Sequence, residues 1–426
     1  MDAREAALKA LIDISYNKDF EKVFDSWGAK TPYRADFGHL VNGVIRNITY
    51  LDFFIEKISQ RKPNFLQNDI RNILRLGFFE LEFTQNPEYA IVNSYVDMVK
   101  QTNSQASSFV NAVLRNFLRQ KGEIKLPSNF LDNLAIKYSH PKWMIKRWVL
   151  HYGKDEIESI LKFNNTPYGL WIRVNTLKIK VNDFLAMLVK EDIDFEQNII
   201  VPECVKINHK GSVTNLIGFE EGLWMVQGVA SSLVANILAP EEDDVVLDIC
   251  AAPGGKTAHM AAMMGNTGRI LALDSSKKRL ERLEENLIRL NIENTSYIVK
   301  DATKVSFTEY FDKILVDAPC SNTGIFSKKP DAKWKKTIED IEALAKIQYE
   351  ILENVSKYLK PDGTMVYSTC SIELEENILV VHRFLQNNKD FVLEPFDIPY
   401  ETEGTLQIIP YEFDMEGFFI AKFKRL

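Results

Sequence analysis

The carboxyl-terminal part of the chain, from about residue 222, alternates short apolar segments with amphipathic ones, and this alternation limits the possible folds. Segments separated by helical periodicity form a doubly wound, mainly parallel α/β sheet. The close spacing of the last segments predicts one antiparallel member. Seven segments predict strands: VVLDIC (245–250), RILALD (269–274), TSYIVKD (295–301), KILVDAP (313–319), TMVYSTC (364–370), FVLEPF (391–396) and GFFIAKF (417–423).

The first of these strands runs into a glycine-rich turn and a helix, in the segment DICAAPGGKTAH. A P-loop is disfavoured because Cys250 stands where its first glycine belongs. A dinucleotide site is disfavoured because Ala252 and Pro253 interrupt the pattern G-x-G-x-x-G. A third interpretation, an S-adenosylmethionine site, fits better. Gly254 and Gly255 permit a tight turn, and the amino terminus of the following helix can receive a carboxylate.

An aspartate ends each of the next three predicted strands, as Asp274, Asp301 and Asp317. Ligands of an open α/β sheet bind beyond the carboxyl ends of its strands, so all three would face one cofactor. Asp274 is placed for the ribose hydroxyls, and Asp301 for the adenine amino group. A single such aspartate is more often a helix cap or turn residue. Three in succession favour the cofactor site.

Two cysteines follow strands of the same predicted sheet, Cys320 in KILVDAPCSNTG and Cys370 in TMVYSTCS. Both thiols would lie at the strand ends that carry the cofactor turn, which suggests covalent chemistry on a substrate beside a bound cofactor. The spacing alone leaves open which of the two attacks. A lone buried cysteine is usually a small apolar residue, and this is the interpretation for Cys204 and Cys250.

The segment from Asp248 to Thr257, DAPCS around Cys320 and STCS around Cys370 resemble the Sun (Fmu) family of RNA cytosine-5 methyltransferases. The resemblance is closest to bacterial members that act on small-subunit ribosomal RNA. It implies a Rossmann-like methyltransferase domain, S-adenosyl-L-methionine as cofactor, and RNA, 16S ribosomal RNA first, as partner. It also implies the cofactor contacts: Cys250, Ala251, Ala252, Pro253, Gly254, Gly255, Lys256, Asp274, Asp301 and Asp317.

The chemistry that the resemblance implies needs an activated nucleophile. Carbon 5 of cytosine reacts only after a thiolate has added to carbon 6, and a base must later remove the carbon 5 proton. By resemblance, Cys370 is the nucleophile and Cys320 assists release as base or acid. Asp317 would bond the cytosine edge. Lys256 would support the cytosine or lower the pKa of a thiol.

The chain departs from the family pattern in two places. After the position of Cys320 the family typically has a glycine and an arginine-rich stretch before PD-x-KW, whereas this chain has SNTGIFSKKPDAKW. The arginines are absent, although Lys328, Lys329, Lys333 and Trp334 keep the basic and aromatic character. In the tail IIPYEFDMEGFF, Tyr411 and Glu416 replace a histidine and an aspartate. These changes concern the placement of the substrate rather than the proposed chemistry.

Residues 1–120 show helical periodicity throughout. LVNGVIRN, ILRLGFFELEF, YAIVNSYVDMVK and FVNAVLRNFLRQ resemble the NusB-like domain that precedes the catalytic part in the bacterial Sun family. Such domains often bind RNA, and a helical bundle that serves only for packing is the alternative. The predicted domains are three: an all-helical NusB-like RNA-binding domain (1–122), linker helices with a small α+β RNA-side module (123–221), and the S-adenosylmethionine-dependent methyltransferase domain (222–426).

The middle domain holds the remaining candidate RNA contacts. SHPKWMIKRWVLHYG sets basic side chains beside two tryptophans, a combination that suits a phosphate backbone with stacked bases. The alternative is that the tryptophans belong to a core. Arg173 in WIRVN is a further candidate contact. The basic residues and tryptophans of the first segment are Lys142, Trp143, Lys146, Arg147 and Trp148.

The composition of the chain limits its possible partners, metals and location. The net charge of −7 is uneven, about +2 over residues 1–240 and −9 over 241–426, so it leaves room for RNA-binding patches. The four cysteines have no zinc-ligand spacing, and no apolar run reaches the ~18 residues of a membrane helix. We expect no metal, no membrane or DNA partner, a monomer, and a cytoplasmic location.

Two other functions stay open at this point. One is a transfer RNA cytosine-5 methyltransferase, against which the NusB-like domain favours the ribosomal target. The other is a non-catalytic RNA-binding or ribosome assembly factor, against which the intact Cys320, Cys370 and Asp317 argue.

Overall fold

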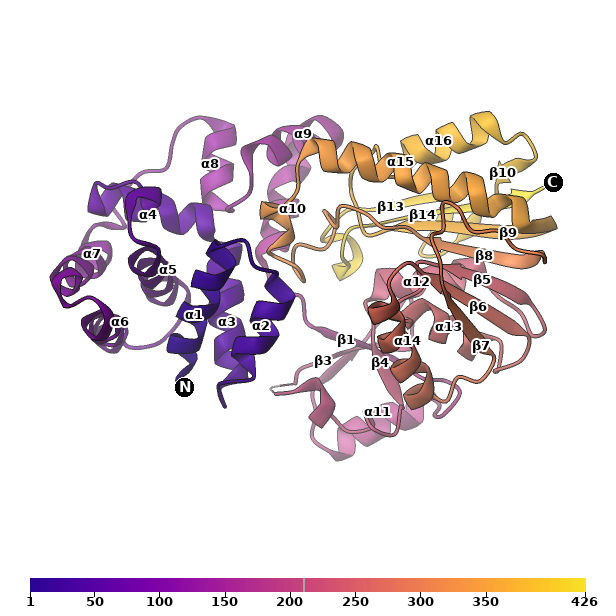
Figure 1. Cartoon of the computed structure of the whole chain (residues 1–426), viewed down its shortest axis with the longest axis horizontal. Coiled ribbons are helices and arrows are strands. Elements are labelled where there is room, and N and C mark those ends of the chain that lie inside the picture. The colour runs from indigo at the N-terminus through magenta and orange to yellow at the C-terminus, as the bar shows by residue number, and fades with distance from the viewer. Residues whose placement is uncertain (210) are drawn as a thin grey trace. The chain divides into compact units, whose positions relative to one another are not determined.

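The computed structural model describes residues 1–209 and 211–426. The chain divides into two compact units, Met1–Thr166 and Pro167–Leu426, and each has its own core (Figure 1). No helix in the described part of the chain is both long enough and apolar enough to cross a membrane. The described residues also hold no cluster of three or more histidine, cysteine or acidic side chains that could bind a metal ion.

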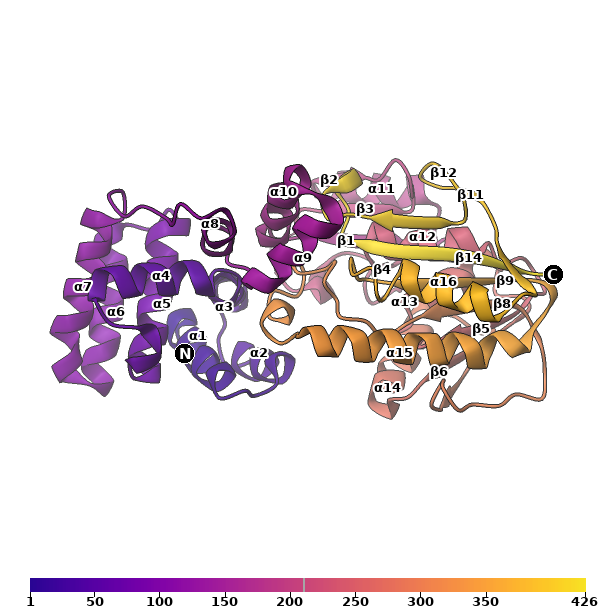
Figure 2. The same cartoon turned by 90° about the horizontal axis from the view of Figure 1, so that it is seen from above.

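The first unit is all-helical over its whole described length. Helix α5 (Asn68–Phe83) lies at its centre and contacts five of the other helices (Figure 2). Because it is surrounded, α5 buries side chains on every face, including Leu74, Phe78 and the carboxylate of Glu80. The other helices are α1 (Ala3–Ser15), α2 (Phe20–Gly28), α3 (Arg34–Arg46), α4 (Ile48–Ser59), α6 (Glu88–Thr102), α7 (Ser107–Gln120), α8 (Phe130–Lys137), α9 (Lys142–Tyr152) and α10 (Lys154–Asn165).

The second unit begins with a small antiparallel sheet of order β2-β3-β1-β4. Its strands are β1 (Leu170–Val174), β2 (Phe195–Gln197), β3 (Cys204–Ile207) and β4 (Trp224–Val226). Helix α11 (Val181–Lys190) buries Phe184 and Leu188 in a core shared with Trp224. This is the expected small α+β module.

The large sheet has the order β10-β14-β9-β8-β5-β6-β7. Its strands β5 to β9 are mutually parallel, whereas β14 pairs antiparallel with its neighbours, so the expected single reversed strand is present. The strands are β5 (Val245–Ile249), β6 (Arg269–Asp274), β7 (Thr295–Val299), β8 (Phe311–Asp317), β9 (Leu359–Thr369), β10 (Phe391–Leu393) and β14 (Phe418–Arg425).

Helices cover both faces of this sheet, as Figure 1 shows. One face packs against α12 (Val229–Leu238), α13 (Gly255–Met263) and α14 (Lys277–Leu290). The other packs against α15 (Ile338–Val355) and α16 (Ile378–Asn387). The predicted fold class, an all-helical domain followed by an α+β module and a seven-stranded Rossmann-like sheet, is therefore confirmed. The predicted boundaries at 122 and 221 stay a prediction.

The tail of the sheet differs from the sequence prediction. FVLEPF is not one strand, since β10 stops at Leu393 and β11 (Phe396–Asp397) pairs separately with β12 (Glu401–Thr402). Pro395 lacks the N–H that a continuous strand would use there. A strand missed by the periodicity, β13 (Thr405–Ile408), pairs with β14.

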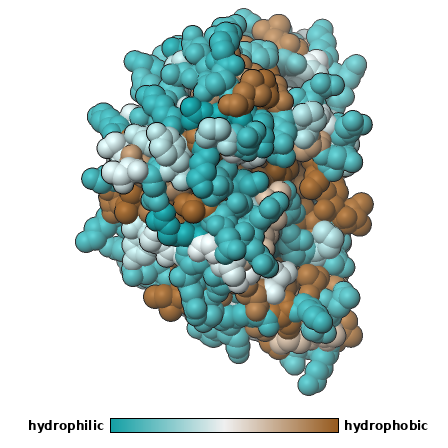
Figure 3. Space-filling view, turned by 90° about the vertical axis from the view of Figure 1, so that its right-hand side faces the viewer, coloured by the Kyte–Doolittle hydropathy of each residue, from teal (hydrophilic) through white to brown (hydrophobic). Residues whose placement is uncertain are grey.

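The face shown in Figure 3 is mainly hydrophilic, with apolar side chains gathered in separate patches.

Helix α3 approaches α5 so closely that one position must be glycine. A Cβ atom on Gly43 would lie 2.0 Å from the Cζ atom of Phe79. Alanine normally stabilises a helix relative to glycine, so a decrease in stability on Gly43→Ala would indicate the close contact with Phe79. We expect a loss of about 1–3 kcal/mol in the free energy of unfolding, measured in urea, because the buried ring must move.

Gly122→Ala is the matched control, because a Cβ atom there meets nothing within 4 Å. Its effect should stay within about 0.5 kcal/mol. Equal stability of the two variants would contradict the packing of α3 against α5.

Candidate active site

The glycine-rich turn joins β5 to α13 through a backbone that few residues adopt. Gly254 has a φ of 98° and directly precedes the helix, which begins at Gly255. Asp248, fully buried on β5, accepts a hydrogen bond of 2.6 Å from the Thr257 hydroxyl on α13. Burial raises the pKa of Asp248 to about 7. This bond fixes the turn at both ends.

Asp274 ends β6 beside the turn and is almost fully buried. One of its oxygens accepts a hydrogen bond of 2.9 Å from the Ser276 N–H. The other lies 3.2 Å from a guanidinium nitrogen of Arg279 and accepts no hydrogen bond from the described residues. Arg279 also donates to the carbonyl of Ala252, so it connects this carboxylate to the turn. An acceptor left open at this point suits a hydroxyl donor.

Asp301 differs from Asp274 because it lies beyond the end of β7 and its side chain is about half exposed. It accepts hydrogen bonds of 2.9 and 2.7 Å from the N–H and hydroxyl of Thr303. These bonds lower the pKa of Asp301. The pattern is that of a turn aspartate whose second oxygen faces outward, 3.7 Å from the Lys304 ammonium.

Lys256 and Asp317 meet at the same edge of the sheet. The Lys256 ammonium, on the first turn of α13, lies 2.8 Å from an oxygen of Asp317 at the end of β8. The Ser368 hydroxyl donates to the other oxygen of Asp317 at 2.9 Å. Both charged side chains remain partly accessible, so a substrate can reach them.

The two predicted thiols lie side by side. The sulfur atoms of Cys320 and Cys370 are 3.1 Å apart, and both cysteines are free. Asn322, on the same loop as Cys320, links the two loops, since Cys370 donates to its side-chain oxygen at 3.2 Å and its amide donates to the Cys320 carbonyl at 3.0 Å. The hydrogen bond with Cys370, together with burial, raises the pKa of Cys320 well above its usual value. The pair therefore holds a proton on Cys320.

The other two cysteines belong elsewhere. Cys204 is buried in β3 and donates to the Ser232 hydroxyl at 3.2 Å. Cys250 lies in the turn with a φ of 62°. Burial raises the pKa of both thiols to about 12. Neither side chain has a hydrogen bond to the cysteine pair.

The candidate RNA contacts of the middle segment divide by burial. Trp148 is fully buried, whereas Trp143 is half buried and Lys146 is exposed. Arg173 is only 2% exposed and donates to the side chain of Gln227 at 2.8 Å. Its guanidinium is therefore not presented to RNA in this structure. The strand pattern of WIRVN gave no sign of this burial, because it depends on a partner 54 residues away.

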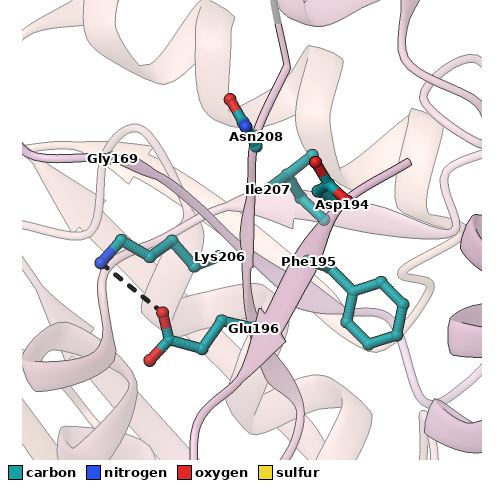
Figure 4. Close-up of a pocket in the computed structure, with 7 residues that line it drawn as sticks. All are labelled: Gly169, Asp194, Phe195, Glu196, Lys206, Ile207 and Asn208. Carbon is teal, nitrogen blue, oxygen red and sulfur yellow. Dashed lines mark ion pairs between the residues drawn. The ribbon is translucent and has the colours of Figure 1, made fainter. Parts of the chain in front are cut away.

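A hollow with about 600 Å³ of empty space lies on the small sheet (Figure 4). It contains none of the predicted site residues. Lys206 and Glu196 face each other within it at 3.8 Å, and Lys206 also pairs with Asp414 at 2.7 Å. Its basic side chain, Lys206, is thus paired with carboxylates, and the other labelled side chains point in different directions (Figure 4).

Three family models match successive parts of the chain. The NusB family matches residues 1–119, and a ferredoxin-like domain of RsmF/B-like methyltransferases matches residues 140–214. The model described as 16S rRNA methyltransferase RsmB/F matches residues 235–424. These assignments correspond to the helical bundle, the small sheet and the large sheet.

Full-length relatives agree with these matches. The chain is 34% identical to a probable ribosomal RNA small subunit methyltransferase B from Bacillus subtilis (strain 168), over 99% of this chain and 98% of that protein. It is 35% identical to the ribosomal RNA small subunit methyltransferase B of Escherichia coli O7:K1, over 91% and 90%. The solved structure of PH0851 is 28% identical, with a TM-score of 0.81 over 100% and 99% of the chains. The chain belongs to the RsmB/F family of S-adenosylmethionine-dependent 16S rRNA cytosine methyltransferases.

Proposed function

We propose that this chain methylates carbon 5 of a cytosine in 16S ribosomal RNA through a covalent bond from Cys370. The observation that carries the residue roles is the pair of thiols, whose sulfur atoms lie 3.1 Å apart. They follow adjacent parallel strands, at the edge where Lys256 meets Asp317. A nucleophile, a second proton carrier and a charged pair for the base are thus assembled in one place.

The residues around the turn fit S-adenosylmethionine. The open oxygen of Asp274 can accept from a ribose hydroxyl, and the backbone of Cys250–Lys256 leaves room for close approach at Gly254 and Gly255. Asp301 and Asp317 complete the proposed contacts. When bound, this cofactor supplies a methyl group activated as a sulfonium.

In the first half of the reaction, the Cys370 thiol loses its proton to solvent, and the resulting thiolate forms a bond to carbon 6 of cytosine. The electron pair of the C5–C6 double bond moves to carbon 5, which would take the methyl group from the cofactor's sulfonium and leave a neutral thioether. Asp317 accepts a hydrogen bond from the cytosine amino group. Lys256 donates to the ring as it takes up negative charge. Cys320 keeps its proton at this stage, because its pKa is raised by the neighbouring Cys370.

The second half of the reaction reverses the role of Cys320. Once Cys370 is bonded to the base, it no longer carries a charge or a thiol hydrogen bond, so the main cause of the raised pKa of Cys320 is gone. Cys320 then loses its proton to solvent and removes the carbon 5 proton as a thiolate. The electron pair of that C–H bond restores the double bond and expels the Cys370 sulfur.

The two thiols should fail in different ways. Cys370→Ala should abolish methyl transfer and covalent adduct alike, because carbon 5 is never activated. In the Cys320→Ala variant, Cys370 should still bond to the cytosine and the methyl group should still be transferred. Release of the RNA from Cys370 should stall, so a stable protein–RNA adduct should accumulate. A denaturing gel with labelled 16S rRNA distinguishes them. An adduct from Cys370→Ala alone would reverse the assignment, and full activity of both variants would exclude covalent catalysis.

Asp274→Ala should weaken cofactor binding by roughly 1.5–3 kcal/mol, because it removes hydrogen bonds to a charged group. Asp301→Ala is the comparison. Its carboxylate is half exposed and already bonded to Thr303, so the loss should be smaller. Calorimetry with S-adenosylmethionine measures both. Unchanged affinity in Asp274→Ala would remove this residue from the proposed cofactor site.

The end of α4 is our candidate for the RNA contact of the helical unit. Arg61 lies over the Phe109 ring at 4.9 Å, and Phe65 is 83% exposed. Lys57, Arg61 and Lys62 are exposed and form no ion pair within the described part of the chain. Unpaired cations beside open aromatic rings suit a phosphate backbone and unstacked bases.

Arg61→Glu should therefore weaken binding to 16S rRNA by roughly tenfold at low salt and reduce the salt dependence. Lys18→Glu is the control, because it makes the same kind of charge change at an exposed lysine already paired with Asp13. Equal effects of the two variants in a filter-binding titration would argue for a general charge effect instead of a contact at α4. Cofactor affinity should not change in either.

The remaining expectations are part of the same proposal. The chain acts as a cytoplasmic monomer, with a NusB-like domain at 1–122, an RNA-side module at 123–221 and the methyltransferase domain at 222–426. The helical bundle, the small sheet and the large sheet support a division into three parts but not the exact boundaries, since the helical unit runs to Thr166 and β4 (Trp224–Val226) belongs to the small sheet.

A further inference from the structure

Each cysteine of the pair is followed directly by a serine, and both serines reach the same buried carboxylate. The Ser371 hydroxyl donates to Glu376 Oε2 at 2.5 Å, and the Ser321 hydroxyl donates to the same oxygen. The Ser321 N–H donates to Glu376 Oε1 at 2.8 Å. All three side chains are completely buried. One carboxylate therefore joins the loop that carries Cys320 to the loop that carries Cys370.

A helix on the outer layer joins the same network. Gln348 on α15 donates to Glu376 Oε1 at 3.0 Å and to the carbonyl of Pro319 at 2.8 Å. Tyr367 on β9 donates to the backbone carbonyl of Glu376 at 2.5 Å. The carboxylate thus accepts four hydrogen bonds, two on each oxygen, from the two cysteine loops and α15.

Burial of the Glu376 carboxylate costs free energy, and packing alone does not explain it. Burial raises the pKa of Glu376, and no cation forms an ion pair with it among the described residues. Taking a carboxylate out of water without a counter-charge is unfavourable, and an apolar side chain would suit the core better. An ionised carboxylate, however, only accepts, so it can bind four donors in one fixed geometry.

We propose that Glu376 is a positioning residue that holds the Cys320 and Cys370 loops at reacting distance through Ser321 and Ser371. It touches neither substrate nor cofactor in this role. The proposal rests on the two-thiol mechanism above. The charge of Glu376 also contributes to the raised pKa of Cys320, so it supports retention of the proton there before attack.

The serine variants test this most directly, because each removes one arm of the network with little change in volume. Ser321→Ala and Ser371→Ala should each lower kcat about tenfold, since small displacements of a reacting group are expensive. The KM for 16S rRNA and the affinity for S-adenosylmethionine should stay the same. The double variant should lose little more than either single one, because both arms act through one carboxylate.

Glu376 itself gives a rescue experiment. Glu376→Ala should lower kcat at least as much as the double serine variant, because it also leaves the Ser321 N–H and Gln348 without their acceptor, while Glu376→Gln should recover most of that loss. The glutamine oxygen can still accept from the Ser321 N–H and from Gln348. Its amide can donate to the two serine hydroxyls, which can reverse their direction. If Glu376→Ala does not fold, the serine variants decide alone.

Ser232→Ala is the matched control, since Ser232 is a fully buried serine that donates to the Gly228 carbonyl at 3.1 Å. It should leave kcat unchanged. Wild-type kcat in Ser321→Ala and Ser371→Ala would overturn the positioning role while the wild-type activity upholds the proposed function. Additive losses in the double variant, or an equal loss in Ser232→Ala, would also overturn it. Absence of methyl transfer by the wild-type chain would instead refute the proposed function.

Discussion

The register between β8 and β9 sets where the two thiols lie. Asp317 pairs with Ser368 across these parallel strands, and the Ala318 N–H donates to the Ser368 carbonyl at 2.9 Å. From that pair, Cys320 follows three residues later and Cys370 two, so both leave the sheet at the same edge. A slip of one residue would turn every side chain of the shifted strand to the opposite face of the sheet. Because β5 also runs parallel beside β8, the cofactor turn arrives at this edge too.

Buried carboxylates then fix what the register brings together. Asp248 holds the turn through Thr257, and Glu376 holds the two cysteine loops through their serines. Burial raises the pKa of both carboxyl groups, because the charged form loses its hydration in the core. Lys256 and Asp317 differ, because they pair with each other and remain partly accessible. The site thus combines hydrogen-bonded carboxylates that position with a charged pair that can meet the substrate.

Hydrophobic periodicity and turn residues predicted most of the helices and strands. The placement of Cys320 and Cys370 at the same edge of the sheet predicted that the two thiols lie close together. The role of Glu376 was not predictable, since its partner Ser321 lies 55 residues away. Glu376 stands in EENILVVHRFLQ, which has helical periodicity, whereas α16 begins only at Ile378. Periodicity places a glutamate like this on a solvated helix face. Long-range hydrogen bonds, like that of Arg173 to Gln227, leave no periodic trace in a single sequence.

The two departures from the family pattern meet in space. Lys328, from the stretch after Cys320, lies 2.6 Å from Glu416 in the tail, and Glu416 is only 2% exposed. A Cβ atom on Gly228 would lie 2.1 Å from the Glu416 carboxylate and 2.4 Å from the Lys328 ammonium. An alanine at this position would therefore have to displace the ends of both side chains from the start of α12. Because a buried charge is tolerated only with its partner, a change at either position constrains the other. Lys328 and Glu416 thus form one ion pair that joins the stretch after Cys320 to the tail of the chain.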